Sequence, residues 1–361
     1  MHDKISWWRT KFGNEEIQHV VNSIKNECVS QGKVTTEFEN KLSEFLEIEN
    51  VIAVSSGSSA LLLALMAVGV KPGDEVIVPN RSWIATAHAA YLLGAKVVLV
   101  DVEPNRPIID VEKIEEKLTS RTRVIMPVHM NGRSANMDRI NEIAKKHKIA
   151  VIEDAAQAIA SRNTDGFLGT QSDIGCFSLS VAKTIATGQG GFAVTNNNEI
   201  AKRMRTIRTH GVENVNDVEQ WGMPGFNFRY TDIQASIGIE QLKRLPERVD
   251  HLREIYMTYE HGLNDTPFKL IPVNLDKGEV PVYSEFLINE RAEWISLLAS
   301  ENIETRAFYP DLNTAPYFNQ QDIIFQNSIS YGKDGVYLPS GPSQNINTIK
   351  YCIDKIKSLS I

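Results

Sequence analysis

Between about residues 50 and 195, short runs of apolar, often β-branched residues alternate with segments of helical periodicity. Most of the runs are nearly all apolar and are bounded by Gly, Pro or Asp, as expected of strands covered on both faces. The strand candidates are residues 51–54, 75–78, 96–100, 124–126, 149–152, 174–178 and 192–195, with helix-like segments at 59–68, 84–93 and 138–148. This alternation predicts an α/β domain with a largely parallel sheet, whose functional crevice lies beyond the carboxyl ends of the strands.

The pattern changes after Gly191. Residues 199–209 and 232–244 have helical periodicity and flank a loop rich in Gly and aromatic residues at 211–230. A helix at about 247–260 then leads into irregular segments, which include residues 281–289 and a final helix at 347–358. For a chain of 361 residues, two domains are expected. We place an N-terminal arm and a large domain at residues 1–246, and a small α+β domain at 247–361, with the boundary near Pro246.

The charge pattern and the cysteines limit the classes of partner that we expect. Acidic and basic residues are interspersed and give a formal net charge of −7, which argues against non-specific nucleic-acid binding but leaves room for a local anion site. The N-terminal segment lacks the apolar core of a signal peptide, and no segment has the apolar length of a membrane span. Cys28, Cys176 and Cys352 are isolated and lack metal-type spacing. We therefore expect a cytoplasmic protein that binds a small molecule, without a metal, a membrane or nucleic acid.

The segment Ser55-Ser-Gly-Ser-Ser-Ala60 lies between an apolar strand and a helix. Ser and Gly suit a helix N-cap, and they leave helix-terminal N–H groups free to bind a phosphate at the positive end of the dipole. The alternative is a capped helix with no ligand. The segment does not have the longer Gly-rich pattern of the nucleotide-binding loops.

The segment Val151-Ile-Glu-Asp-Ala-Ala-Gln157 places Asp154 at the end of an apolar strand. A carboxylate at this edge of the sheet can keep a pyridine nitrogen protonated, which makes the ring an electron sink. Gln157 follows about one helical turn later and could reach the same ligand. The alternative is that Asp154 only caps the next helix.

Two further segments carry a lysine and an arginine. Lys183 lies among small and apolar residues before a Gly-rich turn; partial desolvation would lower its pKa and make the amine a nucleophile toward a carbonyl. Ser178, five residues earlier, could donate to a phosphate. Arg229, in Asn227-Phe-Arg-Tyr-Thr-Asp232, could clamp a carboxylate or phosphate. The alternatives are a surface lysine before a loop, and a helix-entry turn capped by Thr231 or Asp232.

The order of these segments resembles the DegT-type family of fold-type I pyridoxal-phosphate (PLP) enzymes, best known as aminotransferases of keto sugars attached to nucleotides. The likeness is carried by the phosphate-type turn, Asp-Ala-Ala-Gln, Ser five residues before Lys, Thr-Gly-x-Gly-Gly and Asn-x-Arg. It runs from about Phe38 to Gln241 and continues more weakly to the C-terminus. Also similar are Lys71-Pro-Gly-Asp-Glu-Val-Ile-Val-Pro79, Pro127-Val-His-Met-Asn-Gly132 and Leu338-Pro-Ser-Gly-Pro342.

The resemblance implies roles for these residues. Lys183 would hold the cofactor as a Schiff base and later move a proton between the substrate carbon and the cofactor. Asp154 would pair with the pyridinium nitrogen, Gln157 would contact the phenolic oxygen of the ring, and Trp83 would stack on the ring. The phosphate would be held by Gly57, Ser58, Ser59 and Ser178.

The resemblance also implies a homodimer with shared active sites. Asn227 would reach the phosphate bound by the neighbouring subunit, and Arg229 would contact the substrate. Three departures from the family pattern concern the substrate side: Thr187-Gly-Gln-Gly-Gly191 in place of Thr-Gly-Glu-Gly-Gly, Asn131 where Tyr is common, and Trp221-Gly-Met-Pro224 in place of an aromatic–His stretch. The dehydratase branch has His at the position of Lys183, so Lys183 argues against that branch.

The expected function is a ping-pong transamination, in which an amino acid, expected to be glutamate, aminates the cofactor and a keto sugar then accepts the amine. A nucleotide-linked sugar of polysaccharide biosynthesis is the leading acceptor, and a small phosphorylated ketone or a cyclitol is the alternative. A PLP-binding regulator without turnover is disfavoured because Lys183, Asp154 and Gln157 are all present. A dinucleotide-binding oxidoreductase is excluded because no Gly-x-Gly-x-x-Gly turn follows a strand.

Overall fold

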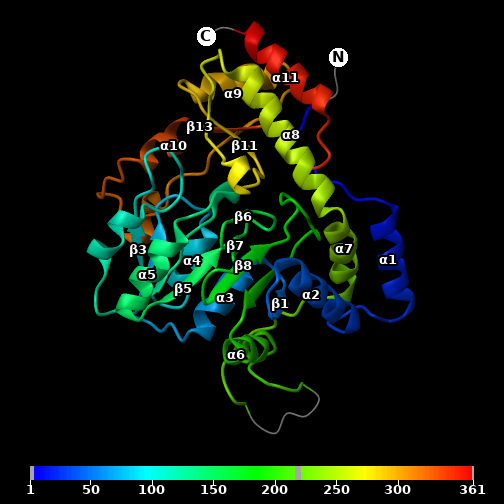
Figure 1. The fold of residues 1–361 in the computed structure, drawn as a ribbon, viewed down its shortest axis with the longest axis vertical. Helices are drawn as coiled ribbons and strands as arrows, with labels where there is room; N and C mark the ends of the chain where they lie inside the picture. Colours follow the sequence, from blue (N-terminus) through cyan, green and yellow to red (C-terminus); the bar gives the residue numbers. More distant parts are fainter. Residues whose placement is uncertain (1–3, 216–220, 360–361) are drawn as a thin grey trace.

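Seven strands form one sheet in a computed structural model that describes residues 4–215 and 221–359 (Figure 1). The strand order is β1-β9-β8-β5-β4-β2-β3, and the sheet is parallel except for β9, which runs antiparallel to both neighbours. The bounds are β1 Asn50–Val54, β2 Glu75–Pro79, β3 Lys96–Val100, β4 Thr122–Ile125, β5 Ala150–Asp154, β8 Ile174–Ser178 and β9 Gly191–Thr195. All seven predicted strands are confirmed, each within two residues of its predicted ends.

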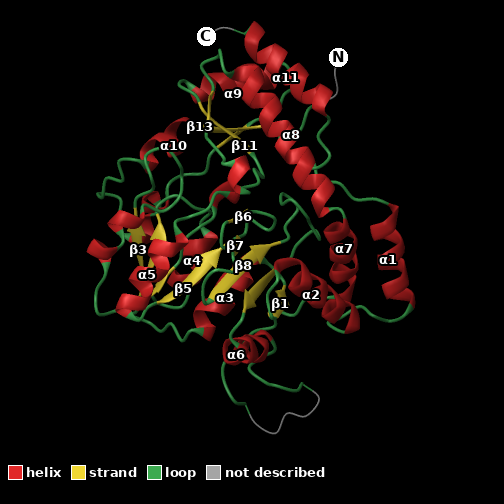
Figure 2. Ribbon diagram, viewed as in Figure 1, coloured by secondary structure: helices red, strands yellow, loops and turns green. Residues whose placement is uncertain are grey.

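Alternate residues of these strands enter different hydrophobic cores, because successive side chains of a strand point to opposite faces. One face packs on α3 (Gly57–Ala67), α4 (Ala85–Tyr91) and α6 (Asn198–Arg208). The other face packs on α2 (Lys33–Leu46), α5 (Met137–His147) and α7 (Asp232–Lys243). The sheet is therefore covered on both faces, as its apolar strands require (Figure 2).

Two N-terminal helices, α1 (Asn14–Lys25) and α2, pack beside α7 and were not among the predicted elements. The Asp232 carboxylate holds the start of α2, because it accepts hydrogen bonds from the Gly32 N–H, the Thr35 N–H and the Thr35 hydroxyl at 2.7–2.8 Å. Thr231 is the N-cap of α7 and accepts from the Gln234 N–H. The predicted helix-entry turn is therefore present, and it also anchors the N-terminal region.

A smaller antiparallel sheet, in the order β10-β11-β13-β12, forms the core of the C-terminal region. Its strands are β10 Lys269–Leu270, β11 Ser284–Leu287, β12 Arg306–Ala307 and β13 Gly335–Leu338, and its helices are α9 Arg291–Ser300, α10 Ser328–Asp334 and α11 Ile346–Ser358. The long helix α8 (Leu245–Leu263) leads into it from the large domain (Figure 1). The proposed domain boundary at Pro246 lies in the first turn of α8.

The N-terminal arm, residues 4–11, crosses to this small domain before the chain enters α1. Ile5 bridges to Ile303, and Trp8 bridges to Ser340. The remaining short elements are β6 Arg162–Asn163, β7 Gly166–Phe167 and the 3-10 helices Val111–Lys113, Glu115–Lys117, Met130–Gly132, Leu275–Lys277, Leu312–Thr314 and Pro316–Phe318. Among the described residues, no helix is both long and apolar enough to cross a membrane.

Candidate active site

A cavity of about 480 Å³ lies at the carboxyl ends of β5 and β8, between the proposed large domain (residues 1–246) and the proposed small domain (residues 247–361). Seven of the residues predicted for the site line it: Gly57, Ser58, Trp83, Asp154, Gln157, Ser178 and Lys183. This position follows from the parallel topology, because the carboxyl ends of neighbouring parallel strands meet at one edge of a sheet. The small domain and the N-terminal arm close the opposite wall.

Lys183 follows β8, in the turn that leads to β9. Its Nζ lies 3.5 Å from the hydroxyl of Tyr283, and that hydroxyl donates to the carbonyl of Ala182 at 2.7 Å. The lone pairs of the Tyr283 oxygen therefore remain available to the amine. Burial lowers the pKa of Lys183 to about 8, although the negative charge of Asp154 opposes this shift. About one tenth of the amine is consequently neutral and nucleophilic at pH 7, far more than for an ordinary lysine with a pKa of about 10.4.

Asp154 ends β5 with its carboxylate buried. Oδ2 accepts from the Thr86 hydroxyl at 2.7 Å, and Oδ1 accepts from the Ala156 N–H at 3.1 Å. Burial raises the pKa of Asp154, while these hydrogen bonds and the charge of Lys183 act in the opposite direction. The Thr86 hydroxyl also bonds with that of Ser82 at 2.6 Å. A chain of hydroxyl groups therefore fixes the orientation of the carboxylate toward the cavity.

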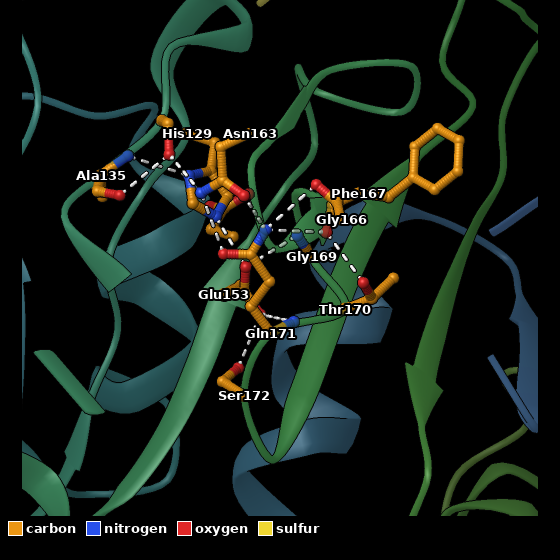
Figure 3. A network of polar contacts seen from close by, with 12 residues as sticks. His129, Ala135, Glu153, Asn163, Gly166, Phe167, Gly169, Thr170, Gln171 and Ser172 are labelled. Atoms are coloured by element: carbon orange, nitrogen blue, oxygen red, sulfur yellow. Dashed lines mark hydrogen bonds and ion pairs between the residues drawn. The ribbon is translucent and has the colours of Figure 1, made fainter. Parts of the chain in front are cut away.

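Glu153, the neighbour of Asp154, anchors a buried polar network on the opposite side of β5 (Figure 3). Its carboxylate accepts from the N–H groups of Gly169 and Gln171 at 2.7 and 2.8 Å, and from the ring of His129 at 2.8 Å. The Ala135 N–H donates to Nδ1 of His129, so Nε2 carries the proton that bonds to Glu153. This network ties β5 to the loop after β4, and so supports the strand end that presents Asp154.

The start of α3 provides an anion site. Ser56 caps this 11-residue helix by accepting from the Ser59 N–H at 3.0 Å. A Cβ atom at Gly57 would lie 2.9 Å from the Cβ of Ser178, so only glycine leaves this space open. Gly57, Ser58 and Ser178 line the cavity, whereas the Ser59 hydroxyl bonds to Ser55 and Ser56 within the turn. The free N–H groups and the nearby hydroxyls suit a phosphate.

Asn131 corrects one expectation. Its side chain was predicted on the substrate side, and this is wrong, because the side chain is buried and pairs with the main chain of Tyr283. Oδ1 accepts from the Tyr283 N–H at 2.6 Å, and Nδ2 donates to the Tyr283 carbonyl at 2.9 Å. The Asn131 N–H donates to Oε1 of Gln157 at 2.8 Å, and the Gln157 side chain also hydrogen-bonds to the hydroxyl of Tyr309. The φ of 54° at Asn131 is one that Asn adopts more readily than Tyr.

Asn227 and Arg229 lie outside the Lys183 cavity of their own chain. Asn227 bridges to Thr209, and Arg229 bridges to Val54. Arg229 lines a separate surface hollow of about 810 Å³ together with Lys202 and other basic side chains. Of the loop predicted at 211–230, residues 216–220 lie outside the described part of the chain. Any role of Asn227 and Arg229 in a cavity like that of Lys183 therefore requires a second subunit.

The small domain and the N-terminal arm supply cavity residues that the sequence motifs missed. They are Trp7, Tyr283, Arg306, Ala307, Tyr309 and Tyr337. Trp83, predicted to stack on the cofactor ring, is 57% exposed and packs edge-to-face on Tyr309 with ring centroids 5.6 Å apart. Five aromatic residues thus line the cavity, and one of them, Tyr283, contacts the lysine. For Tyr283 the available signal was its place in the predicted segment 281–289; no motif marks the other missed residues.

Comparison with known sequences decides the family. A family model described as the DegT/DnrJ/EryC1/StrS aminotransferase family matches residues 10–357. The chain belongs to this family. It is 31% identical over 368 residues to the spore coat polysaccharide biosynthesis protein SpsC of Bacillus subtilis, with 96% of this chain and 95% of SpsC covered. It is 34% identical over 337 residues to the GDP-perosamine synthase of Caulobacter vibrioides, with 91% and 90% covered.

Solved structures share the fold of this chain. DesV of S. venezuelae has a TM-score of 0.93 at 27% identity, with 99% of this chain and 98% of that chain covered. NtdA of Bacillus subtilis, solved with bound PMP, has a TM-score of 0.86 at 28% identity, with 96% and 83% covered. The chain is a PLP-dependent aminotransferase. The cavity fits this cofactor, because it combines a buried carboxylate, a lysine amine and the glycine-lined start of α3.

Capture of the cofactor by cofactor-free protein should accelerate as the pH rises and level off above about pH 8. Only the neutral amine attacks a carbonyl, and burial lowers the pKa of Lys183 to about 8. An ordinary lysine, with a pKa of about 10.4, would give a rate that still rises at pH 10. Stopped-flow absorbance after mixing the protein with PLP between pH 6 and 10 measures this profile. A rate that rises throughout the range would contradict the assigned environment of Lys183.

Proposed function

We propose that this aminotransferase moves an amino group from glutamate to the carbonyl carbon of a nucleotide-linked keto sugar. The observation that carries the proposal is one cavity in which Lys183, Asp154 and the start of α3 face aromatic residues of the small domain. Relatives named for polysaccharide biosynthesis and for the synthesis of a GDP-linked amino sugar support the acceptor class. Because the donor and the acceptor react in turn, both substrates occupy this same cavity.

Each predicted cofactor residue has a proposed task. When bound, PLP supplies an electron sink that stabilises negative charge at the substrate carbon. Gly57, Ser58 and Ser178 hold the phosphate, with Ser59 acting through the turn that shapes the start of α3. Asp154 holds a proton on the ring nitrogen. The amino group of Gln157 would donate to the phenolic oxygen, and Trp83 would cover the ring face.

Lys183 has two tasks in this proposal. Its Nζ would hold the cofactor by condensing with the cofactor carbonyl, with loss of water, and once displaced it would carry a proton between the substrate carbon and the cofactor. The lowered pKa favours both tasks, since an amine with a pKa of about 8 exchanges protons near neutral pH. Tyr283 offers its oxygen to Nζ and limits the directions in which the amine can point.

A homodimer completes the proposal. Asn227 would reach the phosphate in the partner's cavity, and Arg229 would contact the partner's substrate. Exposed aromatic side chains near these residues support an interface, because Trp221 and Phe226 are 77% and 42% exposed in the single chain. The cytoplasmic location remains a prediction from the isolated cysteines; in the structure Cys176 and Cys352 are buried.

An acceptor screen tests the function. With glutamate as donor, 2-oxoglutarate should accumulate when a nucleotide-linked keto sugar is present, and a small phosphorylated ketone or a cyclitol-derived ketone should give at least about tenfold less. The reason is that the remote part of a large substrate contributes binding energy that a truncated substrate lacks. Coupled detection of 2-oxoglutarate gives the rates, and mass spectrometry identifies the aminated product. Faster turnover of the small ketones would refute the acceptor class while leaving the aminotransferase activity established.

A further inference from the structure

Three charged side chains line the cavity within the described part of the chain, namely Asp154, Lys183 and Arg306. The first two are committed to the cofactor in the proposed function. Of these three side chains, Arg306 is therefore the cation that remains available to bind the substrates. Both proposed substrates are anionic, because glutamate carries two carboxylates and a nucleotide-linked sugar carries a diphosphate. An arginine suits either group, since its planar fork donates two parallel hydrogen bonds to a carboxylate or a phosphate.

A continuous series of side chains connects Arg306 to the catalytic lysine. The guanidinium carbon of Arg306 lies 4.5 Å from the centroid of the Trp7 ring. Trp7 in turn stacks on Tyr283, with ring centroids 6.0 Å apart and an interplanar angle of 29°. The hydroxyl of Tyr283 lies 3.5 Å from Nζ of Lys183. Trp7 thus holds Arg306 at a fixed offset from the reacting amine, because cation–π contact orients the guanidinium over the ring.

Main-chain hydrogen bonds fix the position of Trp7. The Ser340 N–H donates to the Trp7 carbonyl at 2.8 Å, and the Glu304 N–H donates to the Ile5 carbonyl at 2.9 Å. The indole Nε1 of the neighbouring Trp8 donates to the Val181 carbonyl at 3.0 Å, two residues before Lys183. The N-terminal arm is therefore bonded both to the small domain and to the lysine turn, so its register sets the distance between Arg306 and Lys183.

Arg306 is available to a ligand. Its side chain is 56% exposed, and its ion pair with Oε1 of Glu304 spans 3.5 Å. Glu304 is shared, because its other oxygen pairs with Lys4 at 3.6 Å. An exposed ion pair of this length contributes little, on the order of 0–1 kcal/mol. A substrate anion that engages the fork of Arg306 would displace it at small cost.

We propose that Arg306, seated on Trp7, is the anion-binding group for the substrates of this enzyme. Since this inference rests on the proposed function, it takes as its ligand a carboxylate of the donor or a phosphate of the acceptor. Arg306 acts in binding and in the choice of substrate, and the proton transfers remain with Lys183. The sequence motifs assigned anion recognition to Arg229, which lines a separate hollow of its own chain.

The two half-reactions of the holoenzyme test the proposal separately. One is the absorbance change on mixing with glutamate, and the other is its reversal when the aminated enzyme is mixed with the acceptor. Arg306→Gln should raise the half-saturating concentration by about 10- to 100-fold, the usual loss for a hydrogen bond to a charged group, with the limiting rate within about threefold of wild type. Lys4→Gln is the matched control, because it removes a cation that pairs with the same Glu304 from outside the cavity. It should leave both reactions unchanged.

The outcomes identify the ligand. A shift in the glutamate reaction alone assigns a carboxylate, a shift in the acceptor reaction alone assigns a phosphate, and a shift in both shows that Arg306 serves each substrate in turn. Trp7→Leu keeps the charge of Arg306 but removes the aromatic ring on which its guanidinium packs. This variant should give a smaller rise in the half-saturating concentration. Direct titration of the holoenzyme with succinate, a dicarboxylate without an amine, gives a binding constant that does not depend on turnover. Unchanged constants for Arg306→Gln in both reactions would overturn the inference, while normal turnover would leave the proposed function intact.

Discussion

Lys183→Ala is expected to lower turnover by at least about 10⁴-fold and to abolish the visible absorption of the covalently held cofactor. The variant loses the group that attaches the cofactor and also the base that moves the proton, and removing a covalent catalyst together with its proton transfer has effects of this size. The amine lies in the cavity with its pKa lowered to about 8 by burial, and within the described residues no second lysine lines the cavity.

Cofactor binding should survive this substitution in a weaker form. Gly57, Ser58, Ser178 and Asp154 still line the cavity, and in the proposed function they hold the phosphate and the ring nitrogen, so the Lys183→Ala protein should hold PLP reversibly and lose it on dialysis. Absorption spectra before and after dialysis, with steady-state rates, give the measurement. Lys71→Ala, at an exposed loop position, is the control and should retain the cofactor band. A dialysis-resistant visible band in Lys183→Ala would contradict the assignment.

Asp154→Asn should lower turnover by about 10²- to 10³-fold, the usual loss for one preorganised group that stabilises developing charge. The substitution keeps the shape of the side chain but removes the charge that would hold a proton on the ring nitrogen. The substitution should also change a second measurable quantity, the pKa of Lys183. Because the charge of Asp154 raises the pKa of Lys183, its removal should move that pKa further below about 8. The plateau of the cofactor-capture profile should therefore begin at a lower pH.

Thr86 offers a matched test of orientation. Thr86→Val keeps the size of the side chain but removes the 2.7 Å hydrogen bond to Oδ2 of Asp154. It should weaken cofactor binding by about 1–3 kcal/mol, as expected for a lost hydrogen bond to a buried charged group, with a smaller loss of turnover than Asp154→Asn. Fluorescence titration with PLP measures the binding constant.

The Asp154→Asn prediction has its own refuting outcome. If the Asp154→Asn variant turned over normally and its cofactor-capture profile were unshifted, the assigned role of Asp154 would be refuted.

The sequence predicted the seven-stranded sheet well because its signals are local. Each strand of the parallel sheet is a short apolar run, and the functional residues follow the strand ends directly, with Asp154 at the end of β5 and Ser178 at the end of β8. One topological rule, that the carboxyl ends of parallel strands share an edge, was enough to bring them together. The position of Lys183 in the site could be predicted because this residue lies in the turn directly after β8.

The rest of the site could not be predicted because it depends on contacts between distant parts of the chain. Trp7, Tyr283 and Arg306 come from the arm and from the small domain, where no motif marks them. Asn131 was misplaced because a motif position gives the path of the backbone, whereas the direction of the side chain depends on Tyr283, 152 residues later. Helices α1 and α2 were missed because their amphipathic pattern lies outside the alternating region.

The N-terminal arm has a consequence for the synthesis of the protein. The amide of Gln344 donates to the carbonyl of Ser6, 338 positions earlier, and Ser340 bonds to Trp7 beside it. At translation rates of about 5–20 residues per second, roughly 20–70 s pass between the synthesis of the arm and the synthesis of these partners. The sheet and the phosphate-binding turn can form during that interval, but the wall made by Trp7, Tyr283 and Arg306 cannot. A nascent chain that meets the cofactor early would therefore hold it in an incomplete, solvent-filled cleft until Ser340 and Gln344 have been synthesised.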